Sequence, residues 1–203
     1  MKPRPDLLAI MLLLFFIASG LTACSGRSAE RAGQGAAMGG IAGAAGGMVT
    51  ALVFGGNVGE AAARGMVYGA TTGGVSGAIV GAQEDQAQKA QRDKTIEKLK
   101  TDLGEDAFNG LSALANCKHE VALGYAKTAA ASENKNYALA GLWLEVLTEA
   151  DRKQEDRART LFPDLIAKDT RISSEAQAEE RMRSALQRLM DIRGEYNLPK
   201  TCR

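Results

Sequence analysis

The chain has 203 residues, of which 45% are hydrophobic and 24% are charged. Its 25 basic and 24 acidic side chains almost cancel, and the formal net charge is +1. This length fits one or two small domains. Because basic and acidic residues are interleaved, the sequence lacks the basic footprint typical of nucleic-acid-binding proteins.

The N-terminus has the three parts of a secretory signal peptide. Lys2 and Arg4 form a short basic region, an apolar run extends over 7–18, and small residues follow. The run is shorter than the roughly 20 residues that a transmembrane helix needs. We therefore predict that residues 1–23 are a signal peptide.

The end of this segment, Leu21-Thr22-Ala23-Cys24, resembles the lipobox of bacterial lipoproteins. The resemblance implies that the Cys24 thiol carries a diacylglycerol, that cleavage precedes Cys24, and that the new amine is acylated. Two or more acyl chains anchor a protein stably in a membrane. Ser25 stands where enteric lipoproteins retained in the inner membrane have aspartate, which implies the periplasmic face of the outer membrane. The alternative is an ordinary signal peptide with a cysteine nearby.

Glycine is concentrated in one segment, because 16 of the 23 glycines lie between Gly33 and Gly81. Many of them recur every four residues, in two series that place a small-residue stripe on one helix face. The zipper glycines are Gly35, Gly39, Gly43, Gly47, Gly65, Gly69, Gly73, Gly77 and Gly81. Each costs an isolated helix roughly 0.5–1 kcal/mol relative to alanine, so we expect partner helices or lipid to compensate.

The two glycine series are separated by Phe54-Gly55-Gly56-Asn57, a turn signal in which Asn57 can cap a following helix. We predict a helix over 32–54, a tight turn, and a second helix over 58–83. The lipobox and this hairpin resemble the glycine-zipper lipoproteins of Gram-negative bacteria, the group of the rickettsial 17-kDa surface antigen and YMGG-like proteins. The resemblance covers residues 21–83 and implies a structural, non-catalytic envelope protein.

Charged residues become frequent again after residue 83. The segment 84–101 lacks an apparent apolar face and predicts a solvated linker helix over 84–104. Six side chains then recur at spacings of three and four residues, which predicts one amphipathic helix. They are Phe108, Leu111, Leu114, Cys117, Val121 and Tyr125.

A further helix is predicted to start near Asn136, and its residues are apolar most of the way round, as in a central buried helix. We expect its polar continuation over 151–157 to be exposed and Pro163 to interrupt it. Ser173 or Ser174 can cap a last helix, and Gly194 can end it.

Lipidation of Cys24 leaves Cys117 and Cys202. An even number of cysteines in an oxidising compartment predicts a disulfide between them. The alternative is a buried, free Cys117 and a reactive Cys202.

The sequence offers little catalytic chemistry. The single histidine, His119, is expected at the surface, since on one helix its side chain would point about 200° away from that of Cys117. Such a pair could not share a metal. Gly33-Gln34-Gly35 lacks the third glycine of a dinucleotide fingerprint, and no Gly-Lys-Ser/Thr of a P-loop follows a glycine loop. We predict no catalytic residues, metal, nucleotide or nucleic acid, and no cofactor beyond the acyl chains at Cys24.

The predicted architecture is all-α. It comprises a signal peptide (1–23), a tether (24–31), a glycine-zipper hairpin (32–83), a linker helix (84–104) and a bundle of three or four helices (105–203). The preferred function is a structural or scaffolding lipoprotein that self-associates or packs at the membrane through its zipper and recruits an envelope protein partner. The alternative is a subunit of an oligomeric envelope pore or secretion complex.

Overall fold

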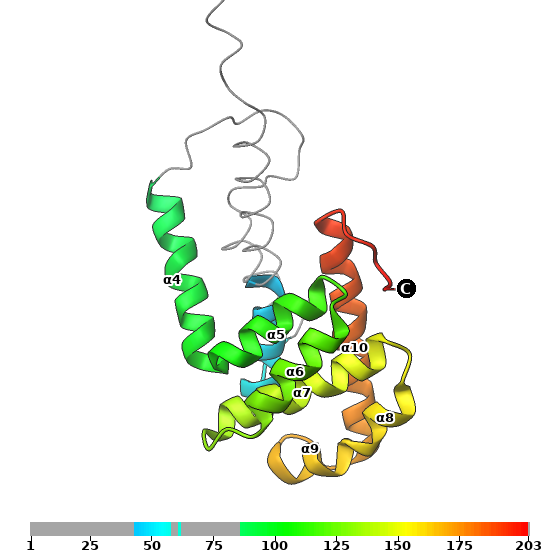
Figure 1. Cartoon of the computed structure of the whole chain (residues 1–203). Helices are drawn as coiled ribbons and strands as arrows, with labels where there is room; N and C mark the ends of the chain where they lie inside the picture. Colours follow the sequence, from blue (N-terminus) through cyan, green and yellow to red (C-terminus); the bar gives the residue numbers. More distant parts are fainter. Residues whose placement is uncertain (1–42, 58–60, 62–85, 203) are drawn as a thin grey trace, which may run out of the picture.

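The computed structural model describes residues 43–57, 61 and 86–202 (Figure 1). Within these ranges the fold is entirely helical, with no strand, which confirms the all-α prediction. Residues 43–54 are helical, and seven helices follow: α4 (Gln86–Leu103), α5 (Glu105–Ala115), α6 (His119–Ala130), α7 (Lys135–Asp151), α8 (Glu155–Thr160), α9 (Phe162–Lys168) and α10 (Glu175–Glu195).

The described part of the first glycine series packs into the core of the helical domain. Its helix, 43–54, contributes Met48, Val49 and Leu52 to the same hydrophobic cluster as Trp143 of α7. Figure 1 shows this segment, blue to cyan, between α4 and α10. Gly43 and Gly47 are both buried here. This stretch therefore packs with the bundle.

The end of this helix is held by Arg171, an arginine in the segment between α9 and α10. The Arg171 Nη2 group donates to the Leu52 carbonyl at 2.6 Å, and Asp169 holds the guanidinium at 2.7 Å. Carbonyls in a last helical turn lack intrahelical donors, so this contact satisfies one of them.

The predicted turn follows. Gly55 and Gly56 have φ values of +85° and +136°, which side-chain-bearing residues rarely adopt. The Ala61 amide then donates to the Asn57 carbonyl at 2.9 Å, which is the first bond of a new helical turn. These residues confirm the turn signal, while the rest of the predicted second helix lies outside the described residues.

Helix α4 is more than a solvated linker. Leu99 and Leu103 are buried, and Ile96 packs with Leu99 against Phe108 of α5. The expectation that 84–101 lacks an apolar face was therefore wrong. Two of its large apolar side chains, Ile96 and Leu99, are three residues apart and join Leu103 on one side of a mostly polar helix.

The stripe predicted as one helix over 108–125 is two helices, α5 and α6. Between them, Asn116 Nδ2 donates to the Ser112 carbonyl at 2.8 Å, and Cys117 takes a left-handed φ of +59°. The Lys118 amide donates back to the Ala113 carbonyl at 2.9 Å. This closes α5 and redirects the chain.

The break changes where the predicted stripe points. Its first three members, on α5, are buried, whereas Val121 on α6 is 50% exposed. The regular spacing in the sequence continues across Cys117, but the left-handed backbone at Cys117 ends the first helix, so later residues do not share its buried face.

Helix α7 is the central buried helix, as predicted. Asn134 caps it by accepting from the amides of Asn136 and Tyr137, and Trp143 lies within it with no exposed surface. Its polar continuation is only partly exposed: Asp151, the last residue, is 8% exposed, contrary to the prediction. Pro163 also departs from the prediction, because it lies in the first turn of α9, where a missing amide costs little.

The region from residue 105 contains six helices, where three or four were predicted, because α5 and α6 divide one expected helix and α8 and α9 are short. Ser174 caps α10 as predicted, accepting from the Gln177 amide at 3.3 Å. Gly194 does not end that helix. It lies inside α10, and the left-handed residue after the helix is Asn197, with a φ of +56°.

Among the described residues, no helix combines the length and the hydropathy required to span a membrane.

Candidate functional site

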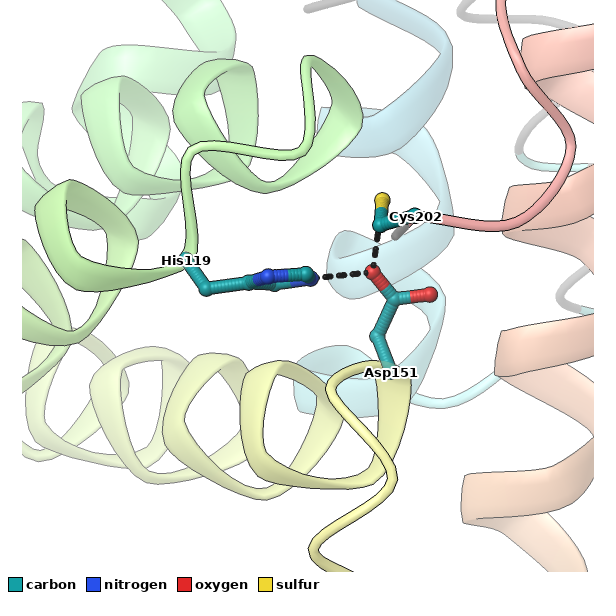
Figure 2. Close-up of side chains that lie close together, drawn as sticks. All are labelled: His119, Asp151 and Cys202. Carbon is teal, nitrogen blue, oxygen red and sulfur yellow. Dashed lines mark hydrogen bonds and ion pairs between the residues drawn. The ribbon is translucent and has the colours of Figure 1, made fainter.

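At one corner of the domain, several buried or partly buried polar side chains lie in contact with one another. The α5–α6 turn, the end of α7, the end of α10 and the C-terminal tail meet there. Figure 2 shows His119, Asp151 and Cys202 pointing toward one another from three of these elements. We call Cys117, His119, Asp151, Arg193 and Cys202 the corner cluster.

The predicted disulfide is present and closes this corner. Cys117, in the turn before α6, is bonded to Cys202 in the tail, with the two Cα atoms 5.5 Å apart. The bond joins residues 85 positions apart. It therefore fixes the tail, which leaves α10 at Asn197, against the first helices of the bundle.

Beneath the disulfide lies a fully buried arginine. Arg193 donates from Nη1 and Nη2 to the two carboxylate oxygens of Asp151, at 2.8 and 2.7 Å. It also donates to the carbonyls of Leu114 and Ala115 at the end of α5, at 2.7 and 3.1 Å. A planar guanidinium suits this paired geometry, and the remaining bonds offset the cost of burying its charge.

His119 completes the cluster and corrects a prediction. Its side chain is 15% exposed, and Nε2 donates to Asp151 Oδ2 at 2.7 Å. It was expected at the surface because it was placed on one helix with Cys117. Since Cys117 lies in a turn, that geometry does not apply. The Cys202 sulfur is 3.3 Å from the same oxygen, and this is a contact without a donated proton, because a disulfide sulfur carries none.

The electrostatics favour an ionised Asp151. Burial alone would raise the pKa of Asp151, but hydrogen bonds from Arg193 and His119, together with their charges, lower it below the usual value. The carboxylate is therefore a fixed negative charge that Arg193 and His119 both face.

The donor atoms of His119, Asp151 and Cys202 lie within 4.8 Å of one another. Imidazole, carboxylate and thiolate groups at this separation are the ligand types that zinc takes. While the disulfide is intact, however, the Cys202 sulfur is bonded to Cys117. In that state the arrangement is an ion-pair network around a covalent bond.

The structure describes some of the other predicted site residues and not others. Cys24, the first two zipper glycines and the series from Gly65 to Gly81 lie outside the described residues. Gly43 and Gly47 are buried, and Cys117 and Cys202 are paired as predicted.

Asp151 and Arg193 were not predicted as site residues from the sequence. One signal for Arg193 was available: it continues the buried series Met182, Ala185 and Leu189 at helical spacing. A charged residue on a core-facing stripe requires a buried partner.

No family model, curated protein or solved structure matches this chain.

Proposed function

We propose that this chain is a lipid-anchored structural protein of the bacterial envelope, without enzymatic activity. In this proposal the acyl chains on Cys24 hold it at the outer membrane. The disulfide-closed helical domain then presents a stable surface to a protein partner. Further copies of the chain, or lipid, would pack against the glycine series.

The observation that supports this proposal most is the Cys117–Cys202 bond. Structural disulfides persist in oxidising compartments such as the periplasm, and a lipobox directs a chain there. The buried position of Gly43 and Gly47 refines the zipper part. Those two glycines serve packing within the chain, so association between copies is assigned to the second series, from Gly65 to Gly81.

Cys24→Ala tests the anchor. The variant should accumulate as an uncleaved precursor or as a soluble protein when membranes are fractionated. Cys202→Ser provides the control, because it also removes a cysteine but leaves the lipobox intact, and it should stay in the membrane fraction. Mature-sized Cys24→Ala protein that fractionates fully with the membrane would refute the anchor.

Gly73→Leu tests the association. A leucine within a close helix contact should reduce crosslinking between copies, because overpacking typically costs about 1–3 kcal/mol. Gly74→Leu is the matched control, since its position lies about 100° around a helix. Equal association of both variants would contradict a packed zipper. A discrete ring in mild detergent would favour the alternative of an oligomeric pore.

A further inference from the structure

We propose that the corner cluster is a redox-dependent zinc site, in which the reduced chain binds one Zn²⁺ through Cys117, His119, Asp151 and Cys202. The disulfide and the metal are then alternative ways of closing the same corner. This inference stands apart from the proposed function, because it concerns a site within the helical domain and needs neither the anchor nor the zipper.

The geometry supports four ligands. Three donor atoms, from His119, Asp151 and Cys202, already lie within 4.8 Å of one another, and Cys117 supplies the sulfur bonded to Cys202. In a tetrahedral site with Zn–S distances near 2.3 Å, neighbouring ligand atoms are about 3–4 Å apart. In the proposed site, the C-terminal tail moves outward after reduction so that the two sulfurs separate to that spacing.

Charge favours the exchange. In the disulfide form, the Asp151 carboxylate is balanced by Arg193, which has no exposed surface. In the zinc form, counted with a neutral imidazole, two thiolates, one carboxylate and Zn²⁺ sum to one negative charge. The same buried guanidinium balances that charge. Neither form leaves an uncompensated charge in the interior, which would be costly.

Outer partners hold the ligands in place, as metal sites require. Arg193 donates to both carboxylate oxygens of Asp151, at 2.8 Å to Oδ1 and 2.7 Å to Oδ2, and so fixes the carboxylate with Oδ2 beside His119 and Cys202. His119 is the first residue of α6 and Asp151 the last residue of α7, so two rigid helices position two of the ligands.

The site is reachable from outside. A surface hollow is lined by Cys117, His119 and Arg152. A second hollow is lined by Cys117, Lys200 and Cys202, so both hollows reach the disulfide. A reductant and a hydrated ion can both approach.

The exchange balances chemically. A phosphine reductant such as TCEP breaks the S–S bond and becomes a phosphine oxide, with water supplying its oxygen and the two thiol protons. A cellular dithiol would instead be oxidised to a disulfide. Zn²⁺ then displaces both thiol protons, and the neutral imidazole of His119 takes the tautomer with its proton on Nδ1, so that Nε2 is free to bind the metal. Because the two thiol protons are released, the site binds metal more tightly as pH rises.

The test is a competition titration of Zn²⁺ between a chromophoric chelator and the untagged full-length chain. The chain must carry no histidine tag, because tag histidines would bind zinc beside His119, which is its only histidine. TCEP-reduced protein should bind one equivalent, and oxidised protein should bind at least about tenfold more weakly, since losing even an outer partner costs this much. Co²⁺ should give the visible bands of a tetrahedral site and a thiolate-to-metal charge-transfer band.

Two variants test the ligands and a third is the control. All are compared with reduced wild type, so that every protein lacks the disulfide. Cys202→Ser and His119→Gln should weaken binding at least about tenfold, and Cys202→Ser should also diminish the charge-transfer band. Cys24→Ser removes the cysteine outside the cluster and should bind like wild type. Circular dichroism of each reduced variant checks that helix content is retained.

Binding that is absent from the reduced wild type, or equal in the oxidised chain, would overturn the proposal. Unchanged binding and spectra in Cys202→Ser would also overturn it, because the metal would then lie elsewhere.

Discussion

Arg193 and Asp151 form a two-bond ion pair in the interior, with Nη1–Oδ1 and Nη2–Oδ2 distances of 2.8 and 2.7 Å. The pair links the end of α7 to the last turns of α10. Because Arg193 also donates to two carbonyls at the end of α5, one side chain joins three helices. The disulfide lies directly over this junction, since Cys202 contacts the same carboxylate.

Arg193→Met should lower the free energy of unfolding by about 3–5 kcal/mol, the usual cost of leaving a buried charge without its partner. The carbonyls of Leu114 and Ala115 would lose their donors as well. Urea denaturation of the oxidised chain, followed by circular dichroism, measures the change.

Arg183→Met on the same helix is the matched control. The Arg183 side chain is 67% exposed and pairs with Glu179, so its loss should cost less than about 1 kcal/mol. Similar losses for the two variants would mean that the Arg193 network contributes no more than a surface ion pair.

Cys117→Ser should destabilise the chain by about 4–5 kcal/mol in the chain-entropy account, because the disulfide closes a loop of 85 residues. The same loss should follow reduction of the wild type in metal-free buffer. Unfolding midpoints with and without reductant give the comparison. If reduction destabilised the Cys117→Ser variant as much as the wild type, the loss would have another origin.

The sequence predicts features that depend on local patterns. The apolar residues around α7 identify the central helix, and Ser174 provides a recognisable cap. The expectation that Cys24 is lipidated in an oxidising compartment leaves two cysteines, which predicts the disulfide. Each of these signals lies within a few residues or follows from composition.

The corner cluster depends on long-range contacts that such patterns do not reveal. Asp151 ends α7 next to exposed charged residues, and its partners His119 and Arg193 are 32 and 42 positions away. The left-handed conformation of Cys117, which turns His119 inward, has no sequence signature like that of glycine. The helical period alone therefore placed His119 at the surface.

Acid should weaken the fold through Asp151. The pKa of this carboxyl is lowered in the folded chain, so the folded state binds its proton less readily than the unfolded state does. Its stabilising contribution is complete above the ordinary value of about 3.9 and is lost as pH falls through the lowered value.

Unfolding free energies of wild type and Asp151→Asn, measured from neutral pH down to about pH 2, test this linkage. The asparagine variant should be less stable at neutral pH, and the difference should narrow below about pH 4. A constant difference over the whole range would show that Asp151 does not carry the acid sensitivity.

The packing of α6 against α7 predicts opposite effects for one substitution at two glycines. A Cβ at Gly141 would lie 2.3 Å from the Ala130 amide nitrogen and 2.7 Å from the Ala126 carbonyl oxygen. These are backbone atoms of α6, so Gly141→Ala must force the helices apart, at a cost of about 1–3 kcal/mol or more.

At Gly124, on α6, a Cβ would meet nothing within 4 Å. Gly124→Ala should therefore stabilise the chain by about 0.5–1 kcal/mol, because alanine is the better helix former. Thermal unfolding of the two variants distinguishes the signs. A stabilised Gly141→Ala would mean that α6 and α7 do not approach each other this closely.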